Sequence, residues 1–463
     1  MTHKPNAPTD RIGTEKISTL LFDFSVPAII GMVVNAVYSI VDRIYVGQGV
    51  DPLGIAGITI VMPVMMVMMA ASMLIGVGAN ALFSIHLGEG RRDEVEKIMG
   101  HALVLLFLVP GVVILLSLVF LDTLLLDILK VSEAVFPYAK TYLKIILYGG
   151  IFSAVGPGIN HFIRSDGHPR TSMFTQILGA VINIILDPIF IFVFDRGIAG
   201  AAWATVLSQF ISFLWVICYF NSRWTKLRFR MQSMKLELNL SLRIIAIGFA
   251  PFAMQAAIGL VNVVLNRTLD FYGGDMAVTS MGIVYSILVI IIMPIQGLNQ
   301  GVQPLIGYNY GAKKYNRVFT AYKLAVLYAT IFVGVGFVLI QGFPGFFIGI
   351  FRSEEGELMQ MGIRSLRTCT LFLPVIGFQI ITANFFQAVG KPIPGTVLSL
   401  SRQILLFIPL VLILPRLFGL YGIFLAMPIA DMGASILSAL MMKQELKKLN
   451  QMSRSRPALS APL

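Results

Sequence analysis

Two long runs of the chain contain no acidic or basic side chain at all. Residues 52–88 and 276–312 lack aspartate, glutamate, lysine and arginine. A helix of about 20 residues crosses the hydrocarbon core of a bilayer, so each run can span it with tilt or protrusion. Over the whole chain 57% of residues are hydrophobic and 13% are charged, against about 25% charged in soluble domains. Because a soluble core cannot hide this much apolar surface, the sequence predicts an integral membrane protein.

The apolar stretches set the number of spans. Twelve of them reach the length that a spanning helix needs. They lie at residues 20–46, 54–84, 99–121, 141–163, 171–194, 197–221, 244–268, 277–307, 324–350, 368–389, 393–415 and 417–442. The sequence therefore predicts an all-α membrane protein with twelve transmembrane helices.

The longest basic segment of the chain, residues 223–243, separates six predicted helices from the other six. This position predicts two lobes joined by a linker. The expected organisation is a cytoplasmic N-terminal tail at 1–17, an N-lobe at 18–222, a cytoplasmic linker at 223–243, a C-lobe at 244–442 and a cytoplasmic C-terminal tail at 443–463.

Lysine and arginine are distributed unevenly between the loops. Most of them lie in the terminal segments and in every second loop, including the linker. Cytoplasmic loops carry this excess in membrane proteins, so we expect both termini in the cytoplasm and the protein in the cytoplasmic membrane. The net charge of +12 is then a topology signal, and we expect no nucleic-acid partner. No cleavable signal peptide is evident in the polar N-terminal segment.

The two halves of the chain repeat each other. SVPAIIGMVVNAVYSIVDRIYVGQG in the first half aligns with FAPFAMQAAIGLVNVVLNRTLDFYG in the second, which pairs Pro27 with Pro251. Six helices per half leave the two copies parallel in the membrane. Parallel repeats imply a pseudo-two-fold axis along the membrane normal, with a central site between two six-helix bundles. We therefore expect alternating access by movement of the two lobes.

Two carboxylates lie within the predicted spans of the first half and have no counterpart in the second. Asp42 aligns with Asn266, and Asp187 aligns with apolar or proline positions near residue 408. A carboxylate at hydrocarbon depth costs about 2.5–3.5 kcal/mol or more, and such residues mark ion or substrate pathways. The asymmetry predicts that ion coupling takes place in the N-lobe.

Each carboxylate shares a helix face with other polar side chains. These faces hold Asn35, Tyr38 and Asp42 on the first helix, and Gln176, Asn183 and Asp187 on the fifth. If the two faces meet, their oxygen atoms suit a small cation or a proton. Asn35, Tyr38 and Gln176 are then candidates for substrate contact. The alternatives are a solvated interfacial pair of Asp42 with Arg43, and a helix-distorting role for Asp187 before Pro188.

Further side chains are candidates for lining a substrate path. They are Asn160 on the fourth helix, Met65 and Met69 on the second, Gln255 and Asn262 on the seventh, and Gln296 and Asn299 on the eighth. Methionine suits adaptable apolar surfaces, whereas interhelical hydrogen bonding is the other role for the amides. A third acid, Asp431, lies in the twelfth helix. Pairing with Arg402 is suggested only because the two opposite charges within the spans would neutralise each other.

Several motifs together resemble a known family. They are Pro27, Tyr38 and Asp42 on the first helix, NIILDPIF followed by GAAWAT, and MPIQGLNQGVQPLIGYNYGAKK on the eighth helix. With the parallel repeat, this pattern is similar to the multidrug and toxic compound extrusion (MATE) family over about residues 18–445, and within it to the DinF/MepA-type branch. The resemblance implies export of large, often cationic compounds.

The resemblance also implies roles for individual residues. Asp42, Asn183, Asp187 and Thr205 would coordinate a proton or Na⁺, with Tyr38 beside them, and Pro27 would be where the first helix bends when Asp42 is protonated. The NorM-type branch instead uses acids on C-lobe helices. That second site is not carried over, because the seventh and tenth predicted helices contain no acid.

The sequence thus favours a monomeric secondary transporter that exchanges amphipathic, often cationic drugs for protons or Na⁺, with no cofactor. A flippase for lipid-linked oligosaccharides is the first alternative, but it calls for a basic cavity, and only Arg402 is basic in the middle of a predicted span. An intramembrane enzyme built on Asp42, Asp187 and His161 is the second. No nucleophile–base spacing, zinc motif or nucleotide-binding loop supports it, and we expect no enzymatic activity.

Overall fold

The computed structural model describes residues 8–351 and 356–454. Every regular element within these ranges is a helix. The ends of the predicted tails, residues 1–7 and 455–463, lie outside the described part of the chain.

The first half of the chain contains six long helices and several short ones. Its elements are α1 (Pro8–Thr14), α2 (Ile17–Gly49), α3 (Pro52–Gly88), α4 (Arg92–Val119), α5 (Leu121–Thr123), η1 (Leu124–Ile128), α6 (Phe136–Ser165), α7 (Pro169–Pro188), η2 (Ile189–Val193) and α8 (Gly197–Asn221). Proline begins α3 and α7, where its missing N–H has no helical partner to lose.

The second half repeats this pattern with more interruptions. Its elements are η3 (Met231–Met234), α9 (Leu238–Gly311), α10 (Tyr315–Gly342), α11 (Pro344–Gly349), α12 (Glu357–Cys369), α13 (Leu373–Ala388), α14 (Pro392–Leu400), η4 (Ser401–Phe407), α15 (Ile408–Phe418) and α16 (Leu420–Arg454).

The helices account for the twelve predicted spans. Ten helices of the described chain are long and apolar enough to cross a membrane, and α12 and α13, which meet at a bend of 50°, together have the length and apolar character of an eleventh. The 74 residues of α9 contain two helices, because Gly274 has φ 61° and ψ −164° there. This conformation favours glycine, and it separates the seventh span from the eighth.

Two predicted spans have wrong boundaries. The ninth was expected at 324–350, but α10 ends at Gly342 and a separate short helix begins at Pro344. Phe343 leaves the helical region before this proline, as residues before proline do. The tenth was expected to begin at residue 368, but α12 already begins at Glu357 and the span bends between Cys369 and Leu373.

Turn geometry follows the internal repeat. Gly90 and Gly167 have positive φ angles of 77° and 89° at the turns after α3 and α6. Lys313 and Gly390, at the equivalent turns of the second half, have φ angles of 59° and 71°. Equivalent turn positions of the two halves thus share a left-handed backbone conformation, although one of them is a lysine and not a glycine.

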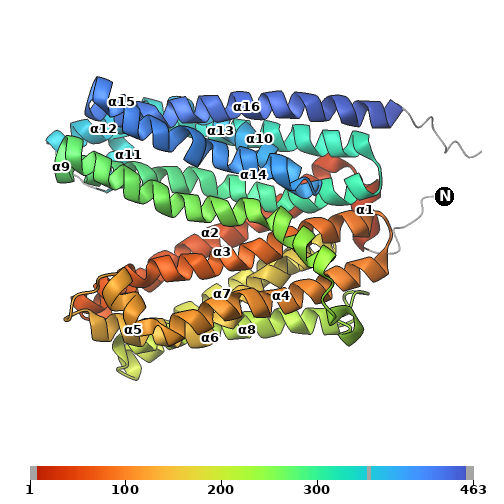
Figure 1. Cartoon of the computed structure of the whole chain (residues 1–463), viewed down its shortest axis with the longest axis horizontal. Helices are drawn as coiled ribbons and strands as arrows, with labels where there is room; N and C mark the ends of the chain where they lie inside the picture. Colours follow the sequence, from red (N-terminus) through yellow and green to blue (C-terminus); the bar gives the residue numbers. More distant parts are fainter. Residues whose placement is uncertain (1–7, 352–355, 455–463) are drawn as a thin grey trace, which may run out of the picture.

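The two lobes diverge toward one end of the molecule. Figure 1 shows α3–α8 in the lower bundle and most of α9–α16 in the upper one, with the described start of the chain at the end where the bundles meet. Backbones touch at that end: a Cβ on Gly88 would lie 1.9 Å from the Tyr308 carbonyl oxygen, and one on Gly311 would lie 1.9 Å from that of Ile85. Only glycine permits this approach.

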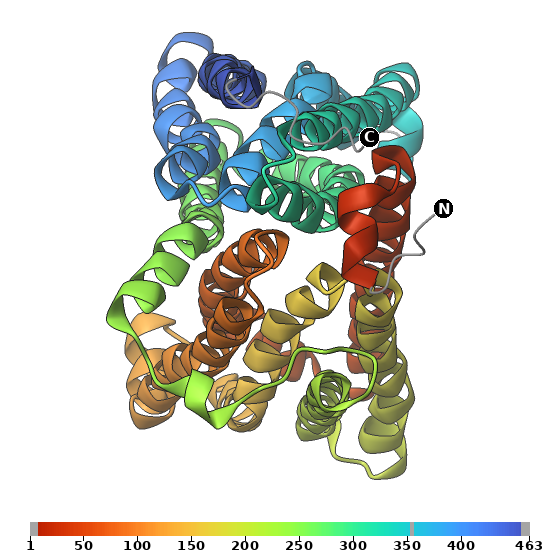
Figure 2. The same cartoon turned by 90° about the vertical axis from the view of Figure 1, so that its right-hand side faces the viewer.

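The segment that precedes each bundle docks onto the opposite bundle. Figure 2 shows α1 beside the C-lobe helices and the chain around η3 crossing in front of the ends of the N-lobe helices. Arg317 of α10 donates hydrogen bonds to the Ile12 and Glu15 carbonyl oxygens at 2.9 and 2.6 Å. On the other side, Arg230 Nε lies 2.8 Å from Glu96 Oε2 of α4. These crossed contacts tie the lobes together at the end where they meet.

Candidate functional site: an acidic pair in the N-lobe

Asp187 lies at the point where α7 changes its helical form. Pro188 follows it, and the chain continues as the π-helix η2. Proline cannot donate a backbone hydrogen bond in a helix, and wider π-turns occur at such interruptions and often at functional sites. The Asp187 side chain is therefore carried at a break inside the N-lobe, where the residue is 0% exposed.

Three of the four residues predicted to coordinate an ion form one buried cluster. Asn183 Nδ2 donates a hydrogen bond to Asp187 Oδ1 over 3.3 Å and lies 3.5 Å from Thr205 Oγ1 of α8. The other oxygens, Asp187 Oδ2 and Asn183 Oδ1, are buried with no hydrogen-bond partner in the described structure. Unpaired buried acceptors are costly, and a cation or a proton would relieve that cost.

The fourth residue, Asp42, approaches this cluster from α2. Its carboxyl group is close enough to that of Asp187 for the two to interact directly, and the phenol of Tyr38 lies within electrostatic range of both. Asp42 is half-buried, whereas its neighbour Arg43 is exposed. No Asp42–Arg43 ion pair within 4 Å occurs in the described structure. The two predicted polar faces therefore meet.

Tyr142 of α6 is a member of this site that the sequence reasoning did not identify. It is 6% exposed, and its phenol lies within electrostatic range of Asp42, Tyr38 and Asp187. The only signal in the sequence is a phenol near the start of the predicted fourth span. Because the phenol can both donate and accept a hydrogen bond, it can follow a change in the protonation or ion occupancy of the carboxyl groups.

Other predicted contact residues lie along or away from this site. Asn35 Nδ2 of α2 donates to Gln176 Oε1 of α7 over 3.2 Å, which joins the two helices that carry the acids. Asn160 instead donates to the backbone oxygen of Ser172. Ser172 is about 22 Å along α7 from Asp187, at 1.5 Å per residue, so Asn160 is not brought together with the carboxyl groups. Pro27 lies within α2, which continues through it as one helix.

The predicted C-lobe contacts lie away from the N-lobe acids, and only two of them share a cavity. Asn262 and Gln296 line a cavity of about 250 Å³ inside the C-lobe. Gln255 Nε2 lies 4.0 Å from the Met69 sulfur of the opposite lobe. Asn299 is buried, and its backbone oxygen accepts a hydrogen bond from Asn384. Met65, on α3 of the N-lobe, is half-buried.

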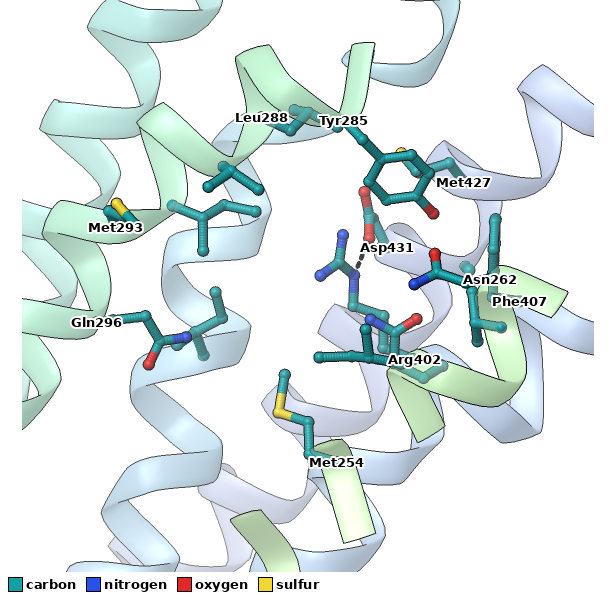
Figure 3. A pocket seen from close by; sticks show the side chains of 17 residues that line it. Met254, Asn262, Tyr285, Leu288, Met293, Gln296, Arg402, Phe407, Met427 and Asp431 are labelled. Carbon is teal, nitrogen blue, oxygen red and sulfur yellow. Dashed lines mark hydrogen bonds and ion pairs between the residues drawn. The ribbon is translucent and has the colours of Figure 1, made fainter. Parts of the chain in front are cut away.

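The suggested pairing of Arg402 with Asp431 is confirmed. Arg402 Nε lies 2.5 Å from Asp431 Oδ1, and the Asp431 side chain is 1% exposed. Figure 3 shows this pair in the wall of the C-lobe cavity. The C-lobe acid is thus neutralised by an arginine of its own lobe, unlike the acids of the N-lobe.

Arg164 follows the predicted fourth span, 141–163, and was therefore expected in the next loop, but this expectation is wrong. Arg164 lies in the last turn of α6 and is 3% exposed. It donates to Ser172 Oγ over 3.2 Å and to the Gln300 backbone oxygen of α9 over 3.4 Å. Asn80 Nδ2 also reaches Gln303 Oε1 across the lobes at 3.3 Å. These hydrogen bonds join the two lobes at the end where their helices meet.

Comparison with known proteins identifies relatives along most of the chain. The multidrug export protein MepA of Staphylococcus saprophyticus is 28% identical over 89% of this chain and 90% of its own length. MepA of Staphylococcus aureus is 27% identical with the same coverage. The predicted resemblance to the MATE family and its MepA-like branch is confirmed.

Solved structures share the fold. One described as the outward-facing conformation of a multidrug resistance MATE family transporter is 24% identical and covers 96% of this chain and 99% of its own, with a TM-score of 0.89. A MOP superfamily transporter from Pyrococcus furiosus is also 24% identical, covers 97% of this chain and 100% of its own, and has a TM-score of 0.89.

The family model described as MatE matches residues 27–189 and 239–413, one segment in each lobe. The matched segments include both acids of the N-lobe and, in the C-lobe, nearly all of α9, which follows the linker. The chain therefore belongs to the MatE family of multi-pass membrane transporters.

Proposed function

We propose that this protein exports amphipathic, often cationic compounds from the cytoplasm in exchange for a coupling cation, either a proton or Na⁺. The observation that carries the proposal is the buried, partly unpaired Asp187 facing Asp42 in the N-lobe. The multidrug export of the MepA relatives supports the same substrate class.

The chemistry of coupling follows from competition for this site. A cation or proton at Asp42 and Asp187 satisfies the unpaired acceptors and neutralises the carboxyl groups. A cationic substrate is attracted only while those groups keep their negative charge. Ion binding and substrate binding therefore oppose each other, which is the differential affinity that exchange requires. Asn183 and Thr205 orient the Asp187 carboxyl group, and Tyr38 lies beside it.

The orientation proposed from the charged loops gives the movement a direction. With both termini in the cytoplasm, the lobes meet at the cytoplasmic end and diverge toward the outside. In this state the acidic pair takes an ion from outside. Closure there and opening at the glycine contacts would release the ion and admit substrate from the cytoplasm or the inner leaflet. Each monomer holds a complete set of these residues, so we propose that one chain suffices for transport.

The test is efflux of rhodamine 6G from proteoliposomes under an imposed proton gradient or, separately, a Na⁺ gradient. One gradient should drive efflux by the wild type, and Asp42→Asn should reduce it to the level of empty liposomes. The substitution copies the second half, where Asn266 stands at the equivalent position.

Asp195→Asn is the matched control, because Asp195 is an exposed acid with φ 49°, which asparagine tolerates. Efflux by folded Asp42→Asn protein at the wild-type rate would contradict the role of the pair. Absence of efflux by the wild type under both gradients would contradict the proposed substrate class.

A further inference from the structure

The C-lobe contains a partly open cavity that the proposed ion exchange does not use. It has a volume of about 250 Å³ and is formed by both helices of α9 together with α13, η4 and α16. Most of its lining is apolar, with Met254, Met293, Phe407 and Met427 among the wall residues. This size is just below the range of small-molecule sites in proteins, about 300–1,000 Å³. The cavity therefore fits a small ligand with an apolar body.

One wall of the cavity carries a buried arginine whose donors are only partly used. Arg402 Nε donates to Asp431 Oδ1, and the Arg402 side chain is 13% exposed. A guanidinium group has five N–H donors in a rigid fork. Figure 3 shows the guanidinium between Asp431 and the open middle of the cavity, with its terminal nitrogens on the cavity side. Those nitrogens are placed to bind a further acceptor.

The acid of the pair is also incompletely satisfied. Asp431 Oδ2 is buried and has no hydrogen-bond partner in the described structure. A buried ion pair of this kind is a weak source of stability, because the desolvation of two charges offsets their attraction. Stability alone therefore does not account for a charged pair in an apolar wall, whereas recognition of a polar group in the cavity does.

Further polar side chains line the same cavity. Asn262, Tyr285 and Gln296 come from the two helices of α9 and face the same space as Arg402 (Figure 3). Among the residues that line this cavity, Arg402 is the only base and Asp431 the only acid. The acid is covered by its arginine, so the accessible charge on the wall is positive. An ammonium group would be repelled there, and a carboxylate would be attracted.

We propose that this cavity is a second ligand site, which binds small amphipathic carboxylates. The ligand carboxylate accepts two hydrogen bonds from the terminal nitrogens of Arg402, the geometry that guanidinium groups favour. The apolar body packs against the methionines and Phe407, which adapt to varied shapes. The site is independent of the N-lobe acids and selects the opposite ligand charge.

The experiment measures binding of three matched probes to the purified full-length protein in detergent by their naphthalene fluorescence. Naphthylacetate is the anion, naphthylacetamide the neutral analogue and naphthylethylammonium the cation. We expect naphthylacetate to bind at least about tenfold more tightly than naphthylacetamide, as the loss of a charged hydrogen bond predicts. Asp42→Asn should leave this preference unchanged, which separates the C-lobe site from the proposed exchange site.

Substitutions of Arg402 and of Asp431 should change the binding of naphthylacetate in opposite directions. Arg402→Gln should abolish the preference for the anion, whereas Asp431→Asn should increase affinity for naphthylacetate because the arginine loses its internal competitor. If Arg402→Gln leaves Asp431 uncompensated and the protein fails to fold, the double variant Arg402→Gln/Asp431→Asn removes both charges and should fold without the preference. The proposal would be overturned if the wild type bound naphthylacetate and naphthylacetamide with equal affinity. It would also be overturned if the double variant kept the preference for naphthylacetate.

Discussion

The two lobes share one helical plan but handle buried charge in opposite ways. In the N-lobe, Asp42 and Asp187 face each other, and neither has a lysine or arginine within ion-pair distance in the described structure. In the C-lobe, Asp431 is bound by Arg402 at 2.5 Å. The arginine thus occupies permanently the place that a transported cation would take beside an acid. We therefore assign the proposed exchange to the lobe whose acids have no cation of their own.

The contacts between the lobes are, by contrast, closely symmetric. Gly88 and Gly311 occupy equivalent positions of the repeat, and each lies against a backbone oxygen of the other lobe. The segments that precede the two bundles also dock crosswise, through Arg317 and through Glu96. Both lobes take part equally in closing the molecule, whereas we assign the coupling chemistry to one of them.

The largest expected effect comes from removing the buried acid. Asp187→Asn should reduce gradient-driven efflux of rhodamine 6G to the level of empty liposomes, because the amide cannot carry the negative charge that attracts either cation. Asp195→Asn is again the control for reconstitution and folding. Substantial efflux by the Asp187 variant would show that the acids of the N-lobe do not distinguish it functionally from the C-lobe.

A second large effect tests the symmetric part of the comparison. Gly88→Val and Gly311→Val each place side-chain atoms against a carbonyl oxygen that would lie 1.9 Å from the new Cβ. Both variants should lose transport to a similar degree, because the lobes can no longer meet at that end. Gly111→Val is the control, since a Cβ there has no neighbour within 4 Å. A loss confined to one of the two positions would show that the lobes do not close symmetrically.

A smaller effect is expected at the crossed docking of α1. Arg317→Gln removes charged hydrogen bonds to the Ile12 and Glu15 carbonyl oxygens. We expect α1 to become less stable by about 1–2 kcal/mol, which hydrogen exchange of residues 8–14 should report as roughly a 5–30-fold loss of protection. Thr320→Ala, an exposed change on the same helix, is the control. Unchanged protection would mean that Arg317 does not hold α1 in place.

The smallest effect is expected from neutralising the C-lobe pair. Arg402→Gln/Asp431→Asn should leave rhodamine 6G efflux within about twofold of the wild type, because an internally paired acid takes no part in cation exchange. The same proteoliposome assay measures it beside Asp187→Asn. A fall to the empty-liposome level would break the comparison and assign coupling to both lobes.

Much of the fold follows from the sequence because the bilayer imposes simple requirements. Span length, charge bias in the loops and the repeat lead to twelve helices in two lobes. The ninth span was misplaced because hydropathy continues across Phe343. The tenth was expected to begin too late because α12 carries charged residues such as Arg364 and Arg367, so it does not read as an apolar stretch. Apolar composition does not distinguish one straight helix from two shorter ones.

The candidate site was recovered where helical periodicity was sufficient. The spacing of Asn183 and Asp187 places them on one face, and their hydrogen bond follows from it. Tyr142 and Arg164 were missed because their positions depend on how α6 packs against other helices. The same limit applies to Asn160 and Asn262, whose polarity indicated burial but not which cavity or helix they contact.

The most direct test of the account is ion release when substrate binds. Purified protein in weakly buffered solution, loaded with protons or with Na⁺, is mixed with rhodamine 6G, and the released ion is followed with a pH indicator or a Na⁺ electrode. We predict release by the wild type and by Arg402→Gln/Asp431→Asn, and none by Asp187→Asn. Release that persists in Asp187→Asn, or disappears in the C-lobe variant, would contradict an exchange site made by the N-lobe acids.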